Sequence, residues 1–234
     1  MPINEMSDNL GTAQPRSIIF VAYPQMGLLD LTGAQTVFWA ATRSLAERGL
    51  QGYALHTASL EGGSIRTGEG LEVQTRSLSE LAGSPMDTLI VPGSPHIRQA
   101  MVESAPLVEW LRAASSSARR TTSVCSGSFF LARAGLLDGL RVATHWVMAD
   151  LFERLFPQVE LDREAIFVQQ GTIWTSAGVS AGIDLALALV EADHGRDVAM
   201  QVARRMVVYY RRPDNQEQWS PLLRSQYPIA HTQV

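Results

Sequence analysis

The stretch Thr121-Thr122-Ser123-Val124-Cys125-Ser126-Gly127-Ser128-Phe129-Phe130 contains the only cysteine of this 234-residue chain. The β-branched residues before Cys125 predict a strand, and the pattern over 129–134 predicts a helix. The small residues between them predict a sharp strand-to-helix turn, a nucleophile elbow, which presents the cysteine and the first N–H groups of the helix to one pocket. At a helix N-terminus the pKa of the thiol is expected to fall. The alternative, a cysteine buried as a small hydrophobic residue, is less favoured because Gly and Ser surround it.

Composition narrows the function classes. The chain is 46% hydrophobic and carries a net charge of -4 without any lysine, which fits one large or two small α/β domains and does not favour phosphate-backbone binding by this chain alone. A single cysteine excludes an intramolecular disulfide and suggests a reducing compartment. With no membrane-length apolar run and no signal pattern, we expect a cytoplasmic protein that does not contact membrane. The chain has neither metal-ligand spacing nor a Gly-rich phosphate loop, so no metal and no cofactor is expected.

Short apolar segments alternate with longer helical ones along the chain. This alternation predicts an α/β fold, with a doubly wound, mostly parallel sheet flanked by helices. Ligands in such sheets bind beyond the carboxyl ends of the strands. The predicted strands are 17–23, 53–58, 71–73, 87–91 and 120–124, and residues 62–68 are predicted to be a turn. The predicted helices are 31–50, 105–119 and 197–210, with a further loop-then-helix unit over 178–195.

Three loops are expected to converge on Cys125. Asp30 follows the first strand, and a carboxyl beside the thiol would move protons, although a first-turn or N-cap aspartate is an equally good interpretation. Gly93 and Ser94 follow a later strand, where backbone N–H groups would stabilise a developing negative charge. His145 would orient or deprotonate the thiol, but a histidine beside tryptophan is more often a packed one.

Several motifs together resemble the ThiJ/PfpI superfamily, which has the class I glutamine amidotransferase-like, flavodoxin-like fold. The similarity covers residues 17–223, and it implies that Ser126 and Gly178 join the pocket residues above. The motifs that carry it are Thr122–Ser128, Ala134–Gly139, Ala143–Trp146, Asp30–Gly33 and Ser176–Asp184.

Two branches of this superfamily share these motifs. In isocyanide hydratases, the elbow cysteine attacks the isonitrile carbon and the aspartate matching Asp30 handles protons. The other branch is the sensor domain of AraC-type transcription regulators, in which the same fold precedes a DNA-binding helix-turn-helix module. The closing segment 203–223, with Arg211-Arg212-Pro213 and Gln218-Trp219-Ser220-Pro221, resembles the end of that sensor domain. It favours the regulator, with the hydratase as the alternative.

The resemblance also sets expectations for organisation and partners. We expect a disordered leader over residues 1–15, the α/β domain over 16–224, and over 225–234 the start of a linker to an absent helix-turn-helix module. The expected partners are a small-molecule effector and a second copy of the chain, with DNA bound only through the absent module. Ser94 stands where the family often has a second glycine, which weakens the oxyanion site there. A third hypothesis is a redox sensor based on an activated Cys125.

Overall fold

The computed structural model describes residues 14–209, 211–214, 216–221 and 225–226. In this part of the chain, eight strands form one sheet in the order β3-β4-β2-β1-β5-β6-β10-β9. All neighbours pair in parallel except the β3–β4 and β10–β9 pairs, which are antiparallel. The strands are β1 Arg16–Val21, β2 Tyr53–Ser59, β3 Gly63–Arg66, β4 Glu72–Ser77, β5 Thr88–Val91, β6 Arg120–Val124, β9 Phe167–Gln170 and β10 Ile173–Ser176, with a small separate pair β7 Arg141–Val142 and β8 Glu160–Leu161.

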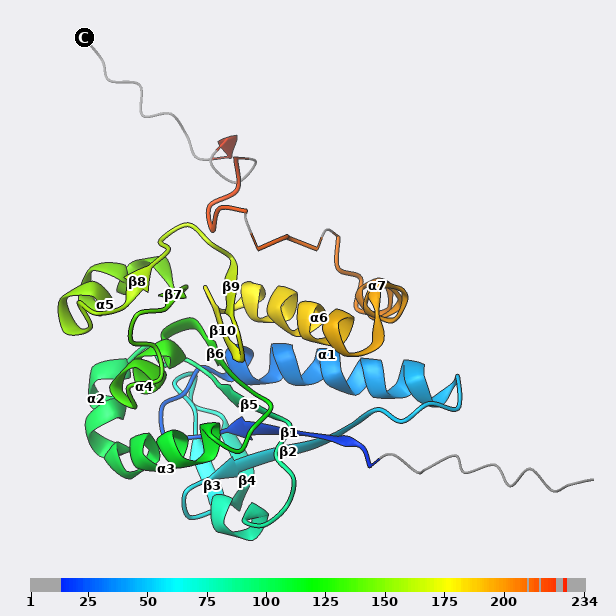
Figure 1. Cartoon of the computed structure of the whole chain (residues 1–234), viewed down its shortest axis with the longest axis horizontal. Helices are drawn as coiled ribbons and strands as arrows, with labels where there is room; N and C mark the ends of the chain where they lie inside the picture. The colour runs from blue at the N-terminus through cyan, green and yellow to red at the C-terminus, as the bar shows by residue number, and fades with distance from the viewer. Residues whose placement is uncertain (1–13, 210, 215, 222–224, 227–234) are drawn as a thin grey trace, which may run out of the picture.

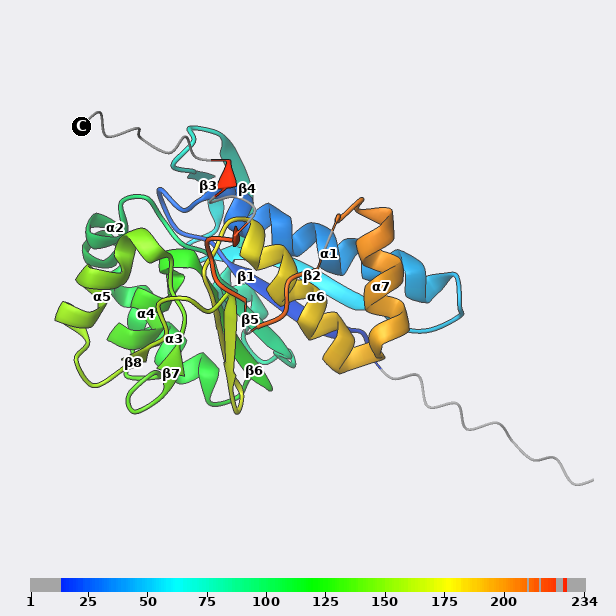
Figure 2. The same ribbon diagram turned by 90° about the horizontal axis from the view of Figure 1, so that it is seen from above.

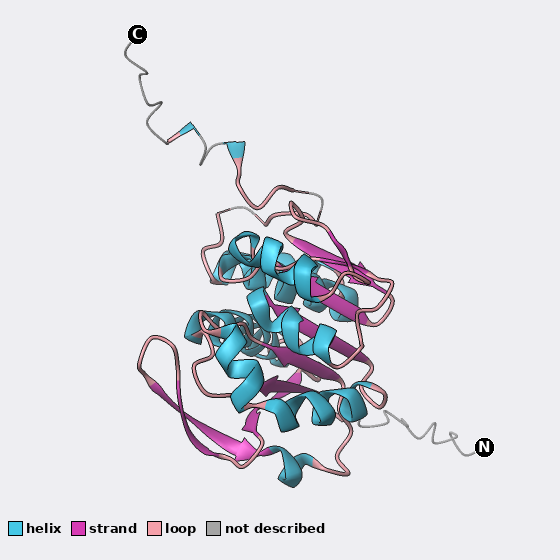
Figure 3. Ribbon diagram, turned by 90° about the vertical axis from the view of Figure 1, so that its left-hand side faces the viewer, coloured by secondary structure: helices cyan, strands magenta, loops and turns pink. Residues whose placement is uncertain are grey.

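Helices cover both faces of the sheet. Helices α1, α6 and α7 pack together on one face, and α2, α3, α4 and α5 lie on the other (Figures 1 and 2). Figure 3 shows the strands layered between them. This arrangement confirms the predicted doubly wound α/β fold. The helices are α1 Leu28–Ala46, α2 Ile97–Glu103, α3 Ala105–Ser115, α4 Ser128–Arg133, α5 Ala149–Leu155, α6 Ser180–His194 and α7 Arg196–Arg205, with short 3₁₀ turns η1 Leu78–Leu81, η2 Cys125–Gly127 and η3 Trp146–Met148.

The central strands form the core because they are covered on both sides. Every residue of β5 and β6 is buried, as are residues 18–21 of β1. Such continuous burial explains why these segments are unbroken apolar or β-branched runs rather than alternating ones. These strands end on the same edge of the sheet, where the loops after β1, β5 and β6 meet.

Several boundaries differ from the sequence prediction. Helix α1 begins at Leu28 because the Glu69 carboxylate accepts the Leu28 N–H at 2.9 Å, a cap supplied by a distant loop. The predicted turn over 62–68 is largely strand β3, since it pairs antiparallel with β4. The predicted helix 105–119 ends at Ser115, and a separate helix, α2, precedes it.

The ends of the chain are only partly described. The predicted leader over 1–15 and linker over 225–234 fall mainly on residues 1–13 and 227–234, which lie outside the described residues. The predicted helix over 197–210 is observed as α7, which ends at Arg205. Among the described residues, no helix has the length and apolar character needed to cross a membrane.

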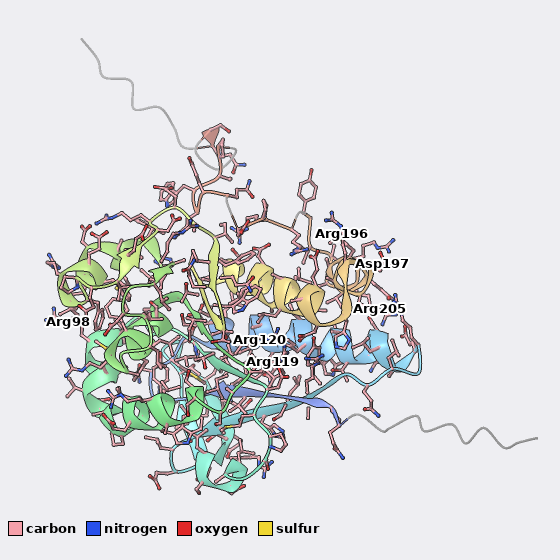
Figure 4. All side chains as sticks on the ribbon, viewed as in Figure 1. Arg98, Arg119, Arg120, Arg196, Asp197 and Arg205 are labelled. Carbon is pink, nitrogen blue, oxygen red and sulfur yellow. The ribbon has the colours of Figure 1, made fainter. Side chains whose placement is uncertain are left out.

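A buried ion network closes the opposite edge of the sheet. The Asp193 carboxylate at the end of α6 is fully buried, and it accepts hydrogen bonds from the guanidinium groups of Arg119 and Arg120. The Tyr53 hydroxyl donates to the same carboxylate at 3.0 Å. Arg119 also pairs with Asp87, and both arginines are labelled in Figure 4. The network therefore fastens α6 to the amino ends of β2 and β6.

Asp193→Ala is expected to destabilise the fold strongly. Removing one partner of a buried ion pair leaves the remaining charges uncompensated, at a cost of about 3 kcal/mol or more. The free energy of unfolding from urea titration measures this loss. Glu80→Ala removes one partner of the exposed Arg76–Glu80 pair and is the matched control, with an expected loss below about 1 kcal/mol. Equal losses in the two variants would contradict the stabilising role of the network.

Candidate functional site

Cys125 lies at a sharp turn between β6 and α4, as the elbow motif predicts. Its φ is +59°, a region that non-glycine residues rarely adopt, and it opens the 3₁₀ turn Cys125–Gly127. Two glycines make this turn possible. A Cβ on Gly127 would lie 2.2 Å from the Val91 carbonyl oxygen, and one on Gly178 would lie 2.2 Å from the Cys125 Cβ. The elbow thus requires glycine at both positions, because a side chain at either one would collide with the neighbouring residue.

Asp30 connects the cysteine to two neighbouring loops. It lies in the first turn of α1 and is only 5% exposed. Its carboxylate accepts the Gly93 N–H at 3.1 Å and the Val179 N–H at 2.7 Å, and it lies on the same cavity wall as the Cys125 thiol, whose pKa its charge raises. Asp30 is therefore a first-turn residue, but it caps other loops rather than its own helix, whose N-cap is Gly27.

Ser94 and Ser126 join the loop after β5 to the elbow. The Ser94 N–H donates to the Ser126 hydroxyl at 2.9 Å, and that hydroxyl donates to the Ser94 carbonyl oxygen at 2.9 Å. The Ser94 hydroxyl in turn donates to the Gln25 carbonyl oxygen at 2.6 Å. Both serines are buried. Their side chains therefore set the spacing between the two loops.

His145 borders the site without bonding to the thiol. Its ring accepts the Val147 N–H at 3.3 Å and stacks on Trp146 with ring centroids 5.8 Å apart. Burial lowers the pKa of His145, so the imidazole is neutral at physiological pH. The loop is fixed to the elbow instead by Thr144, whose hydroxyl donates to the Cys125 carbonyl oxygen at 3.2 Å.

The electrostatics of the thiol contradict the sequence prediction of a lowered pKa. Burial raises the pKa of Cys125 above its ordinary value, the Asp30 carboxylate raises it further, and hydrogen bonds with Ser126 oppose the shift only in part. Burial likewise raises the pKa of Asp30, against the lowering effect of the N–H groups of Val179 and Gly93. The prediction considered only the helix N-terminus, whose effect is smaller than burial beside a carboxylate.

A cavity of about 440 Å³ opens above these groups. It brings together five of the residues singled out in the sequence: Asp30, Ser94, Cys125, Ser126 and His145. The other two lie against the elbow, Gly93 with its N–H directed to Asp30 and Gly178 packed on the cysteine. The remaining lining residues, which sequence reasoning missed, are Gly27, Leu29, Glu69, Pro95, Val147, Met148 and Val179.

Glu69 is the most informative of the missed residues. It lies between β3 and β4, a segment that the sequence pattern describes only as turn-rich, so nothing indicated that it would reach α1. Its charge raises the pKa of Asp30 slightly. The cavity therefore has two carboxyl groups, a neutral imidazole, a thiol and hydroxyls on an otherwise apolar wall. Within the described ranges, no cluster of three or more His, Cys, Asp or Glu side chains could hold a metal ion.

Asp30→Asn is expected to activate the thiol. Loss of the negative charge lowers the pKa of Cys125, so its reaction with iodoacetamide at about pH 8 should accelerate by about tenfold. Asp197→Asn, at an exposed carboxylate on α7 labelled in Figure 4, is the control and should leave the rate unchanged. An unchanged rate in Asp30→Asn would contradict the assigned effect of Asp30 on the thiol.

Comparisons with known proteins identify relatives of two kinds. The HTH-type transcriptional regulators GbdR and CdhR of Pseudomonas aeruginosa are 30% and 31% identical over 89% and 85% of this chain. The aligned regions make up 55% and 57% of those regulators, so the chain spans about half their length. The isonitrile hydratase of Pseudomonas putida is 32% identical over 78% of this chain and 74% of its own length.

Solved structures and a family model agree on the fold. An AraC family transcriptional regulator from Pseudomonas putida superposes with a TM-score of 0.70 at 23% identity, over 82% of this chain and 100% of that one. Drosophila melanogaster DJ-1beta superposes with a TM-score of 0.71 at 22% identity, over 84% of this chain and 100% of that one. The DJ-1/PfpI family model matches residues 16–192, a span that includes the elbow, Asp30 and every other lining residue of the cavity. The chain belongs to the DJ-1/PfpI family.

Proposed function

We propose that this chain is the small-molecule-sensing and dimerising region of an AraC-type transcription regulator. DNA binding would be supplied by a helix-turn-helix module outside the chain, and the regulator would act in the cytoplasm. The observation that carries the proposal is the match to GbdR and CdhR, which covers 89% and 85% of this chain but only 55% and 57% of theirs. Nearly half of each regulator is thus available for a second module. The net charge of -4 also favours DNA contacts made elsewhere.

The chemistry of the cavity supports sensing over catalysis. A thiol with a raised pKa is protonated at neutral pH, and the protonated form is a weak nucleophile that is also slow to oxidise. Because a protonated thiol is slow to oxidise, a redox sensor based on Cys125 is also less favoured. Ligand cavities typically measure about 300–1,000 Å³ and have apolar walls with few polar groups. A cavity of about 440 Å³ with Asp30, Ser94, Ser126 and His145 on its wall fits a small effector.

A cysteine-dependent isonitrile hydratase is the second candidate. It is favoured by the presence of Cys125 and the Asp30 carboxylate in the same cavity, together with the similarity to the Pseudomonas putida enzyme. In this reaction the Cys125 sulfur would attack the isonitrile carbon, and its proton would pass to the Asp30 carboxylate. Asp30 would then serve as the acid and base for addition of water, which releases the N-substituted formamide and restores the thiol.

An isonitrile assay separates the two candidates. The protein is incubated with cyclohexyl isonitrile, and the N-substituted formamide is measured by chromatography. Because the thiol is protonated, we expect no formamide above the level produced by Cys125→Ala. Turnover that is lost in both Cys125→Ala and Asp30→Ala would establish the hydratase instead.

The gene itself provides an independent check of the regulator. We expect the reading frame in the source genome to continue past Val234 into a helix-turn-helix module. A stop codon directly after Val234 would remove the main support for the proposal.

A further inference from the structure

The segment after α7 crosses the molecule towards the cavity. We call residues 211–214 and 216–219 the C-terminal strap. In Figure 1 it runs, in orange to red, from α7 across α6 towards β9. The strap contains the Arg-Arg-Pro and Gln-x-Gln-Trp motifs. Neither ligand binding in the cavity nor catalysis at Cys125 explains why these motifs are present. Two of the strap's attachments adjoin segments of the cavity wall, and a third, between the guanidinium of Arg211 and the Glu191 carboxylate, lies farther along α6.

The first attachment is Arg212 on α6. Its backbone N–H donates to one Asp184 carboxylate oxygen at 2.9 Å, and its Nε donates to the other at 2.9 Å. Its guanidinium also donates to the Ser180 hydroxyl at 2.9 Å. Asp184 is 3% exposed, so this is a partly buried ion pair with specific geometry. Ser180 directly follows Val179, which lines the cavity.

The second attachment is Gln218, whose amide holds the loop that carries His145. Its Oε1 accepts the Trp146 N–H at 3.1 Å, and its Nε2 donates to the Thr144 carbonyl oxygen at 3.0 Å. One side chain therefore binds the backbone on both sides of His145. The Gln218 N–H also donates to the Glu164 carbonyl oxygen at 2.8 Å.

Both wall loops are thus held from two sides. On the cavity side, Asp30 accepts the Val179 N–H, and Thr144 donates to the Cys125 carbonyl oxygen. On the outer side, Gln218 holds the loop that contains His145, and Arg212 holds the start of α6, which directly follows Val179. Val179 has a φ of +50°, a conformation that is costly for a β-branched residue and persists only where its surroundings impose it. A ligand that hydrogen-bonds to the Asp30 carboxylate or contacts His145 would therefore alter the contacts that position both loops.

We propose that the C-terminal strap reports occupancy of the cavity, with Arg212 and Gln218 as positioning residues that couple the two wall loops to the strap. The inference rests on the proposed sensing function, in which the strap would lie between the sensing domain and the DNA-binding module. Coupling of this kind is reciprocal: whatever loosens the strap also changes access to the cavity, by the same free energy. It therefore has two independent signatures.

The first signature needs no variant and no knowledge of the natural ligand. Iodoacetamide at about pH 9 alkylates Cys125, the chain's only cysteine, and places a carbamidomethyl group in the cavity. Hydrogen–deuterium exchange is then compared between the alkylated and unmodified protein. We expect exchange in peptides spanning 211–219 to rise by about tenfold while peptides from β1 and β5 remain protected.

The second signature is the reverse effect. Gln218→Ala should raise the rate of Cys125 alkylation about threefold or more, because the His145 loop loses its outer attachment. Gln201→Ala on α7 is the matched control, since it removes a glutamine hydrogen bond to Arg48 outside the cavity wall, and its rate should equal that of the unsubstituted protein. Arg212→Gln should act in the same direction as Gln218→Ala through Val179.

Either of two hydrogen-exchange results would overturn the inference. One is equal exchange over 211–219 before and after alkylation, and the other is a uniform rise that includes β1 and β5, which would mean general unfolding. An unchanged alkylation rate in both strap variants would contradict it as well. None of these results bears on the regulator itself, which fails instead if the protein hydrates the isonitrile or if the gene ends at Val234.

Discussion

The carboxylate of Asp30 is the group on which the rest of the site depends. It follows β1, it accepts N–H groups from the loops after β5 and β10, and it shares a cavity with the thiol at the end of β6. These four strands are neighbours in the order β1-β5-β6-β10. A buried carboxylate is costly to desolvate, and its two backbone donors offset part of that cost. One side chain thus holds the carboxyl ends of the central sheet in a single arrangement.

The same carboxylate determines the chemistry of the cavity. An elbow cysteine in a positive environment is an activated nucleophile, whereas here burial and a neighbouring negative charge keep the thiol protonated. The elbow geometry is therefore present, but burial beside this carboxylate disfavours the thiolate. Cys125 acts as part of a cavity wall, and its neighbours Ser94, Ser126 and His145 contribute shape and hydrogen-bonding capacity. This combination favours recognition of a small molecule over its conversion.

Local sequence patterns predicted the parts of the structure that depend on local interactions. The strand-to-helix break at Cys125, the buried strands β1, β5 and β6, and the approach of Asp30 to the elbow all follow from short motifs and parallel-sheet topology. The hairpin β9–β10 was not predicted, because β9 ends in the exposed pair Gln169-Gln170 and this sequence is not typical of a buried strand.

What the sequence could not indicate were contacts between distant segments. The Glu69 carboxylate, from the segment between β3 and β4, accepts the first N–H of α1. The Gln218 side chain hydrogen-bonds to the loop that contains His145, and the Asp193 carboxylate pairs with arginines from other elements. The pKa of Cys125 could not be predicted from the local sequence either. It depends on burial and on a carboxylate from another element, neither of which is visible in the residues around the cysteine.

A pH titration of the Cys125 thiol shows whether this elbow holds a protonated thiol beside a buried carboxylate. The chain has one cysteine, and its five tyrosines also ionise at high pH, so the difference in ultraviolet absorbance between the protein and Cys125→Ala reports the Cys125 thiolate alone. We expect little thiolate up to about pH 8.5, the ordinary pKa of a free thiol, and an increase in thiolate above that pH. A midpoint at or below about pH 7 would instead mean that Cys125 is an activated nucleophile.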